Sequence, residues 1–335
     1  MTTYKGIRGL TIRTVAGDPS PLIAGDIWYS STAKKIRGAK LGAGAWASGG
    51  NTNTGIDAGG YLGIQTAAMY FGGRGGSPIT TAVDTSETYD GSSWTETADL
   101  PTAIYQNAGF GTVTAGVSRG GMNASNAATT ASHEWNGTSW TTGNAGQNAN
   151  RNIHGTGTQT AGLTAGGSPG TYSQKSETYD GTTWTETNDL NLARWGLPLV
   201  GTSAAALAIG GTMAPDNGAT TTQDWDGTTW TTNSASINEG KATAAAAGTT
   251  TAAMIFGGFG GGGTSSATVN TESWDGSSWT EVGNLATARD AIMGGQSSPN
   301  TAAVAFGGQL PGSSAVSNST EEWNVSPAAS SFTSS

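Results

Sequence analysis

The sequence contains no cysteine, which excludes disulfide bridges and metal sites built on thiolates. Only 11% of its 335 residues are charged, and only two are histidine. No stretch approaches the roughly 20 consecutive apolar residues of a membrane-spanning helix, and residues 1–6 lack the apolar core of a secretory signal. We therefore expect a chain that is made in a cytoplasm without a signal peptide, does not insert into a membrane, and is stabilised by burial and strand pairing.

Positive charge is scarce and lies mostly at one end. The net charge of −9 argues against a general nucleic-acid-binding protein. Residues 1–40 nevertheless hold seven Lys or Arg and two Asp, a net charge of +5, whereas the rest of the chain carries −14. This division predicts a separate functional segment at the N-terminus.

Glycine and tryptophan, with 54 and 12 residues, are abundant and regularly placed. An aromatic residue, Asp-Gly or Asn-Gly, two Ser or Thr, and a Trp recur in that order five times. Asp-Gly and Asn-Gly between β-type residues predict a tight hairpin in which both central turn residues have positive φ. The copies are Tyr89–Trp94, Trp135–Trp140, Tyr179–Trp184, Trp225–Trp230 and Trp274–Trp279.

Trp46 and the second Trp of each hairpin are spaced 44 to 49 residues apart. Each interval contains an inner strand (a), an apolar strand that ends in a glycine doublet such as Gly257-Gly258 (b), and the strand that opens the hairpin (c). The strand that begins at the Trp is d. Four strands in a period in the mid-forties are typical of a β-propeller blade, and the count predicts an all-β, six-bladed propeller.

The two ends of the repeat complement each other. The last c strand, residues 319–324, contains Trp323 but is followed by no Trp, and Trp46 has no c strand before it. We therefore expect an N-terminal outer strand around Trp46 to complete the sixth blade and to close the ring. The predicted domains are a basic N-terminal segment (1–43), the propeller (44–325) and a Ser/Ala-rich C-terminal tail (326–335).

Residues 1–43 do not fit the repeat. Within them, residues 25–29 and 34–37 predict a small β-hairpin with a basic second strand, and such a hairpin is marginally stable alone. It should need a partner, and its free edge could also pair with another copy of the chain to give a homo-oligomer. The candidate anchoring residues are Trp28, Tyr29, Lys34, Lys35 and Arg37.

The repeat resembles the kelch-repeat β-propellers over residues 45–324. The matching features are the apolar run with Gly-Gly at 254–258 and 304–308, the Tyr or Trp that follows, the later Trp, and the Leu-x-x-Ala-Arg turn at 190–194. The gap between the aromatic residue and the Trp is shorter than in the usual kelch unit, which implies a tighter hairpin. Residues 25–38 also resemble virion-associated fibre or decoration proteins of tailed, particularly marine, phages, and this likeness implies a structural or adhesion protein of a virion.

Signatures of catalysis and metal binding are weak. His133 and His154 belong to different repeats, and no motif joins them. The Asp-Gly turns lack the alternating Asp spacing of a calcium loop, and the glycine doublets are not followed by the Lys-Ser or Lys-Thr of a phosphate loop. No Gly-x-Ser-x-Gly elbow is present. We expect no metal, no cofactor and no enzymatic activity.

Loop lengths distinguish the two faces of the predicted ring. The c–d loops and the a–b loops share one face and are short, whereas the b–c loops share the other face with the d–a junctions. The b–c loops are long: residues 74–83, 118–131, 168–176, 212–222, 259–270 and 309–318. All seven Lys and Arg of the propeller map to this second face. The candidate ligand-binding residues there are Arg74, Tyr105, Arg119, Arg151, His154, Arg194, Trp195, Lys241 and Arg289.

Two roles for these cations remain open. They could recognise a glycan or an acidic partner, or they could pair with the repeated acids Glu87, Glu177, Glu272 and Glu321 and hold neighbouring blades together. On the first reading the protein is a non-enzymatic adhesion protein of a phage virion, docked to other virion proteins through residues 1–43 and bound to a host surface glycan or protein. The alternative is a kelch-type interaction scaffold of a bacterium or host cell, and an enzyme on the same scaffold is a third reading.

Overall fold

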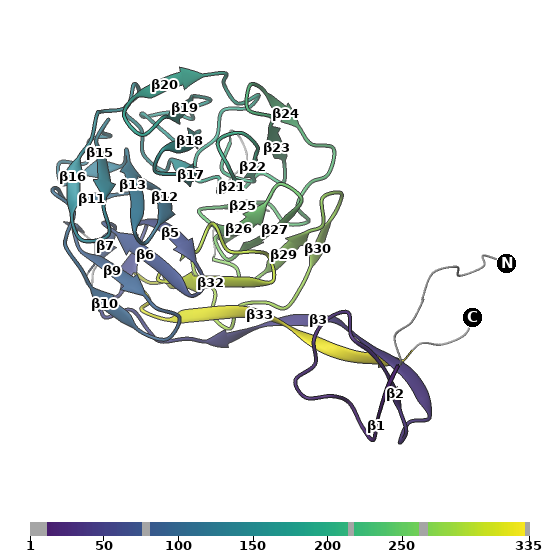
Figure 1. Ribbon diagram of the computed structural model, residues 1–335. Coiled ribbons are helices and arrows are strands. Elements are labelled where there is room, and N and C mark those ends of the chain that lie inside the picture. The colour runs from purple at the N-terminus through teal and green to yellow at the C-terminus, as the bar shows by residue number, and fades with distance from the viewer. Residues whose placement is uncertain (1–11, 76–80, 214–217, 261–266, 332–335) are drawn as a thin grey trace. The chain divides into compact units, whose positions relative to one another are not determined.

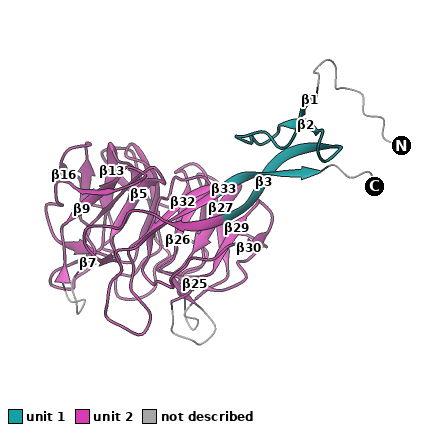
Figure 2. Ribbon diagram, turned by 90° about the horizontal axis from the view of Figure 1, so that it is seen from below, with its two compact units in different colours: residues 1–44, 325–335 teal, residues 45–324 magenta. Residues whose placement is uncertain are grey.

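A computed structural model describes residues 12–75, 81–213, 218–260 and 267–331. These residues form strands and no α-helix, so the prediction of an all-β chain is confirmed, and among them there is no helix that could span a membrane. The chain divides into two compact units: a smaller unit of residues 1–44 and 325–335, and a larger unit of residues 45–324 (Figure 2). Residues 1–11 of the predicted anchor and parts of the loops 74–83, 212–222 and 259–270 lie outside the described residues.

The larger unit contains five four-stranded antiparallel sheets, each formed by strands of one sequence repeat. This confirms the predicted four-stranded repeat. Sheet 1 comprises β5 (Gly60–Ile64), β6 (Ala67–Phe71), β9 (Ser86–Tyr89) and β10 (Trp94–Glu96); sheet 2, β12 (Ala108–Thr112), β13 (Ala115–Arg119), β15 (Ser132–Trp135) and β16 (Trp140–Thr142); sheet 3, β17 (His154–Thr158), β18 (Ala161–Ala165), β19 (Ser176–Tyr179) and β20 (Trp184–Thr187); sheet 4, β21 (Leu199–Gly201), β22 (Ala206–Ile209), β23 (Thr222–Trp225) and β24 (Trp230–Thr232); sheet 5, β26 (Ala245–Thr249), β27 (Ala252–Phe256), β29 (Thr271–Trp274) and β30 (Trp279–Glu281).

Sheet 6 contains both ends of the chain. Its order is β31 (Met293–Gly294), β32 (Ala302–Phe306), β33 (Thr320–Ser331), β3 (Lys35–Ser48), β2 (Ile27–Ser30) and β1 (Arg13–Val15). The first strands of successive sheets contact one another from β5 through β12, β17, β21 and β26 to β31, and β31 contacts β5. The six sheets of the larger unit therefore follow one another around a closed ring (Figure 1), consistent with a propeller-like repeat.

The Asp-Gly hairpins form where the sequence predicts them, but their geometry differs. In the first hairpin Tyr89 pairs with Trp94, and the Asp90 N–H donates to the Ser93 carbonyl at 3.2 Å. Only Gly91 has a positive φ, of 91°, so the prediction that both central residues are left-handed is wrong. Asp90 stands before the turn, and its Oδ1 accepts the N–H groups of Ser92 and Ser93, each at 2.8 Å. The acid therefore stabilises the turn through its side chain.

These turn contacts predict a pH dependence. The hydrogen bonds lower the pKa of Asp90 and Asp275 to about 2 and also lower the pKa of Asp180 and Asp226. Because each pKa is lower in the folded chain, the stabilisation is complete above about pH 4 and is lost as the pH falls toward 2. Asn136 makes the same two contacts at 2.9 Å with a group that does not titrate. A variant with all four Asp replaced by Asn should therefore show a smaller fall in melting temperature between pH 5 and pH 2.5 than the natural protein. An equal fall in melting temperature for the two proteins would contradict this role of the Asp side chains.

The outer edge of each sheet carries an aromatic pair. Tyr89 stacks on Trp94 with ring centres 5.0 Å apart, and Tyr179 stacks on Trp184, while the ring pairs of the other three hairpins are tilted, with centres 5.2 to 5.3 Å apart. In three hairpins the Trp Nε1 also donates to a Ser or Thr of the preceding sheet; Trp230, for example, donates to Ser176 at 3.1 Å. Trp46 makes both contacts for sheet 6: its ring lies 5.7 Å from Trp323, and its Nε1 donates to Thr271 at 3.1 Å. Trp46 and Trp323 thus supply the sixth outer pair.

The smaller unit is built around a hairpin of β2 and β3, in which Trp28 pairs with Arg37 and Ser30 with Lys35. β1 adds to it in parallel. Two boundaries differ from those expected from the sequence. β3 is one continuous strand from Lys35 to Ser48 rather than two separate strands, and β33 continues to Ser331 where a tail was expected. The physical reason is that β3 and β33 are hydrogen-bonded neighbours in sheet 6, so each satisfies backbone groups of the other. The Ser330 hydroxyl also donates to the Gly38 carbonyl at 3.4 Å.

Candidate functional site

Six junctions lead from one sheet of the larger unit to the next, and each bends through a residue with a left-handed backbone. Several of these residues are joined by backbone hydrogen bonds around the centre of the ring. Gln106 N–H donates to the Ala58 carbonyl at 2.6 Å, Gly196 to Asn152 at 3.0 Å, Thr243 to Gly196 at 2.8 Å, and Ala58 to Ala291 at 3.2 Å. We call these six residues the collar; they are Ala58, Gln106, Asn152, Gly196, Thr243 and Ala291, with φ between 47° and 64°.

The residue before each collar position pairs with the beginning of a b–c loop. Arg151 and Ser168 exchange backbone hydrogen bonds of 3.3 and 2.8 Å, and Trp195 and Thr212 exchange bonds of 3.2 and 2.8 Å. The remaining pairs are Asp57 with Arg74, Tyr105 with Met122, Ala242 with Phe259, and Asp290 with Gln309. Among them are the short strands β4 (Ile56–Asp57) with β7 (Arg74–Gly75) and β8 (Thr81–Ala82), β11 (Ile104–Tyr105) with β14 (Met122–Asn123), and β25 (Lys241–Ala242) with β28 (Phe259–Gly260). Junction residues and b–c loops are thereby held together on one face.

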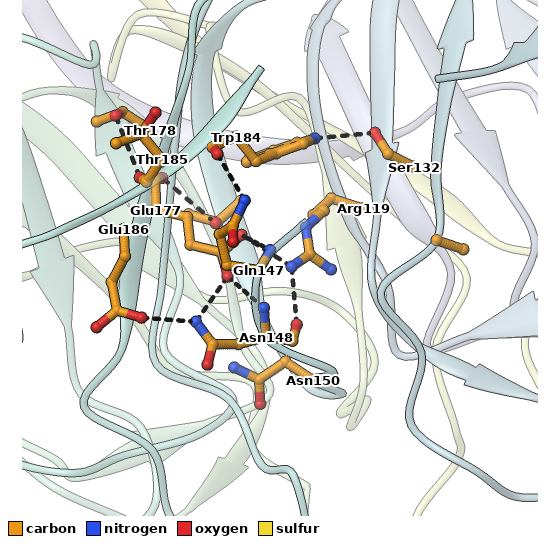
Figure 3. Close-up of polar contacts among 12 residues, drawn as sticks. Arg119, Ser132, Gln147, Asn148, Asn150, Glu177, Thr178, Trp184, Thr185 and Glu186 are labelled. Carbon is orange, nitrogen blue, oxygen red and sulfur yellow. Dashed lines mark hydrogen bonds and ion pairs between the residues drawn. The ribbon is translucent and has the colours of Figure 1, made fainter. Parts of the chain in front are cut away.

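Several predicted ligand-binding cations are instead part of the packing between sheets. Arg119 on β13 is fully buried, and its Nη2 lies 2.8 Å from Glu177 Oε2 on β19. The Glu177 carboxylate also accepts the Asn148 N–H at 2.8 Å and the Gln147 N–H at 3.3 Å, as Figure 3 shows. The Arg119 guanidinium lies 5.1 Å from the centre of the Trp184 ring. This network joins sheet 2 to sheet 3 and leaves no part of Arg119 exposed to a ligand.

Arg289, Arg194 and Lys241 are buried in the same manner. Arg289 pairs with Glu321 at 2.7 Å, and Lys241 pairs with Glu239 at 3.1 Å. Arg194 has no carboxylate partner; it donates to the Gly210 carbonyl at 2.7 Å and to Gln223 at 2.9 Å, and burial lowers its pKa to about 10. For these residues and Arg119 the structure favours the packing role over ligand binding.

Arg74 and Tyr105 lie together at another part of the same face. Arg74 is bound in a fork by the buried Asp57, at 3.1 and 2.7 Å, and its guanidinium carbon lies 5.5 Å from the centre of the Tyr105 ring. The Tyr105 hydroxyl donates to Asn126 at 2.9 Å. The principal hydrogen-bonding groups of both residues are therefore already engaged.

The centre of the ring leaves little space. A cavity of about 30 Å³ is lined by collar residues together with Tyr61 and His154, which is room for about two water molecules. The Tyr61 hydroxyl lies 3.5 Å from His154 Nδ1, and burial lowers the pKa of His154 to about 4. The other histidine, His133, contacts Thr102. Among the residues that the structure describes, no three His, Asp or Glu side chains are grouped as metal ligands.

A larger open groove lies where three junctions meet the b–c loop of sheet 3. Its volume is about 490 Å³, within the range of ligand sites. Arg151 and Trp195 line it, and both are half-buried. The other lining residues are Gln106, Asn152, Ser168, Gly170, Thr171 and Tyr172. We call this set the junction groove; it offers two aromatic rings, one guanidinium, two amides and two hydroxyl groups besides the Tyr172 phenol.

The predicted anchoring residues all lie in the smaller unit. Trp28 is buried and Tyr29 half-buried, whereas Lys34 and Lys35 are exposed. Arg37 is bound by Asp18 at 2.6 and 2.8 Å. Five large aliphatic residues of this unit are also exposed by 43 to 61%: Ile12, Ile23, Ile27, Ile36 and Leu41. Sequence reasoning identified the basic residues but missed these exposed aliphatic residues.

Of the predicted ligand-binding residues, the structure brings Arg151 and Trp195 together in the junction groove, and His154 lies beside it in the central cavity. Sequence reasoning missed the groove residues Gln106, Asn152 and Tyr172. Gln106 and Asn152 could have been found by aligning the junctions, because both occupy the collar position and Asn tolerates a left-handed backbone. Comparison of the sequence with the models of known protein families gave no match, and comparison with curated proteins gave none either.

Proposed function

We propose that the larger unit is a six-bladed, kelch-like β-propeller whose ring is closed by the outer strand around Trp46. The closed cycle of contacts between the first strands supports six blades, and the contacts of Trp46 with Trp323, Phe256 and Thr271 support closure by β3. The resemblance of residues 45–324 to kelch repeats supports the family assignment.

On this scaffold the protein is a non-enzymatic recognition protein that binds a host surface glycan. The observation that carries this proposal is the junction groove, because it combines the aromatic rings of Trp195 and Tyr172 with amide and hydroxyl groups in an open site of about 490 Å³. Aromatic faces can pack against the C–H face of a sugar ring, while the polar groups bond to its hydroxyls. The described lining contains no carboxylate and no histidine, so it offers binding groups without the usual general acid or base.

The smaller unit is proposed to dock the protein to an acidic surface of another virion protein. Several of its aliphatic residues, such as Ile23 and Leu41, are exposed, and residues 1–40 carry a net charge of +5. Exposed apolar and basic side chains are complementary to an acidic protein partner with apolar groups of its own. The resemblance of residues 25–38 to phage fibre and decoration proteins supports a place on the particle.

Trp195→Ala should weaken binding to a glycan array or to host cells by at least about 10-fold, because an aromatic anchor of the groove is removed. Tyr105→Ala is the matched control, since Tyr105 occupies the equivalent junction position outside the groove. Thermal unfolding of both variants establishes that they are folded. Binding that is lost in Tyr105→Ala and kept in Trp195→Ala would place the site elsewhere on the face. A wild-type protein that binds a protein partner but no glycan would favour the scaffold role.

Charge reversal of Lys34, Lys35 and Lys40 should reduce incorporation into particles while leaving glycan binding intact.

A further inference from the structure

The larger unit has one half-exposed cation for which the described residues provide no acidic partner. Of its seven Lys and Arg, five form ion pairs with Asp or Glu: Arg74, Arg119, Lys175, Lys241 and Arg289. Arg194 is fully buried against carbonyl groups and Gln223. Arg151 has no carboxylate within salt-bridge distance in the part of the chain that the structure describes, and its Nη1 contacts only the Met122 sulfur, at 3.0 Å. A thioether is a weak acceptor, so most of the Arg151 donors remain available.

We propose that the junction groove selects acidic sugars, with the sugar carboxylate on Arg151 and the sugar ring against Trp195 and Tyr172. The inference rests on the proposed glycan-binding function and specifies the ligand class of the same site. Arginine binds a carboxylate through two parallel N–H···O bonds, which fixes both position and orientation. The larger unit itself carries a net charge of −14, which repels anions in general. A bound anion therefore needs a cation close to its site, and Arg151 can supply it.

Three other open pockets of similar size do not combine these groups. The pocket beside Asp290 and Gln309 has a similar volume of about 500 Å³ but contains no Lys, Arg, Trp or Tyr. The pocket beside Glu321 has neither a cation nor an aromatic ring. The pocket beside Tyr89 and Trp135 has rings but also contains Asp90 and no cation. Of these four pockets, the junction groove is the one in which both the ring and the carboxylate of an acidic sugar have partners.

The groove also offers groups for the hydroxyls of a sugar. Gln106 and Asn152 contribute side-chain amides to its lining, and Ser168 and Thr171 contribute hydroxyl groups. Such groups can donate to or accept from sugar hydroxyls, beside the cation that would bind a carboxylate.

The groove is also held in place before a ligand binds. Arg151 and Trp195 are fixed by their backbone pairs with Ser168 and Thr212, and Asn152 accepts the Gly196 N–H at 3.0 Å. Gln106 and Asn152 have φ of 58° and 48°, a conformation that persists only where surrounding contacts maintain it. Binding groups on such a frame lose little conformational freedom when a ligand arrives, which favours affinity.

The test uses full-length protein and pairs of oligosaccharides that differ only in charge: a uronic-acid or nonulosonic-acid oligosaccharide and its carboxyl methyl ester. Calorimetry should show that the ester binds about 10- to 100-fold more weakly than the acid, because it cannot accept a charged bidentate contact. Arg151→Gln should reduce acid binding by a similar factor and leave ester binding unchanged. Arg151→Lys should retain more acid binding than Arg151→Gln, since the charge remains but the fork is lost.

Lys175→Gln is the control for a general change in charge, because Lys175 is a surface cation 42% exposed in its side chain and paired with Glu186 outside the groove. Acid and ester that bind equally, or an Arg151→Gln loss no larger than that of Lys175→Gln, would overturn the acidic-sugar inference. If neutral glycans then still bind in a Trp195-dependent manner, the proposed function survives without it. If no glycan binds to the folded natural protein, both the function and the inference are wrong.

Discussion

Replacement of Trp46 by alanine is expected to lower the free energy of unfolding of the larger unit by about 3 kcal/mol. The change removes a ring that lies 4.9 Å from Phe256 and 5.7 Å from Trp323, and it removes the hydrogen bond to Thr271. Because β3 is the fourth strand of sheet 6 in the larger unit, the loss affects the place where the ring closes. Urea denaturation followed by tryptophan fluorescence measures it.

Two control variants distinguish the loss of ring closure from the general effect of removing a large side chain. Trp46→Phe retains an aromatic ring but loses the hydrogen bond and part of the ring contact, so it should cost less, about 1–2 kcal/mol. Trp28→Ala removes a buried ring of the smaller unit and should leave the unfolding of the larger unit unchanged. A Trp46→Ala protein whose larger unit unfolds at the same urea concentration as the natural protein would show that β3 does not stabilise the ring.

Removal of the Glu177 side chain should destabilise the protein far more than removal of its cationic partner. Glu177→Ala is expected to cost about 3–5 kcal/mol, because it leaves the buried Arg119 without a counter-charge. Arg119→Met should cost about 1 kcal/mol or less, since Glu177 would keep its amide donors, including the Asn148 N–H at 2.8 Å. Two buried nitrogens of Arg119, Nε and Nη1, have no hydrogen-bond partner within the described part of the natural protein, so their removal also relieves a desolvation cost.

Glu272, the acid of sheet 5 at the position of Glu177, supports the expectation that the acid depends less on the arginine than the arginine depends on the acid. Glu272 accepts the Asn238 N–H at 2.7 Å, the Asn238 side-chain amide at 2.8 Å and the Glu239 N–H at 3.2 Å, and no Lys or Arg side chain among the described residues donates to it. The double variant Glu177→Ala with Arg119→Met should recover stability relative to Glu177→Ala alone, as a double-mutant cycle would measure. Equal costs for the two single variants would mean that Glu177 depends on Arg119 and not on the junction amides.

The repeat could be predicted because its determinants are local. Asp90 and Gly91 specify their turn through contacts two or three residues away, and the Trp that follows stacks on the aromatic residue five positions earlier. The role of Trp46 is not local, but it could be predicted by counting, because every other c strand has its own Trp. The exact φ of the turn could not be predicted, since Asp-Gly suits more than one hairpin geometry.

The roles of the cations could not be predicted from the sequence. Arg119 and Arg151 both appear as isolated basic residues near the same face, yet Arg119 meets Glu177, 58 positions away, while Arg151 meets no acid among the described residues. The difference depends on which residues face each other between sheets. The junction groove could not be predicted for the same reason. It combines residues from three successive junctions, namely Gln106, Arg151 and Trp195, with Tyr172 from a loop.

The collar has a consequence for how this protein can change. Its links run from backbone N–H to backbone carbonyl, so the frame places few demands on the side chains it carries. Within this one chain the six positions already hold Ala, Gln, Asn, Gly, Thr and Ala, and the residues before them include Asp, Tyr, Arg and Trp. New surface chemistry can therefore arise by single substitutions at half-buried positions such as Tyr105, Arg151 and Trp195, while buried positions such as Asp57 and Ala242 stay fixed and the fold is kept.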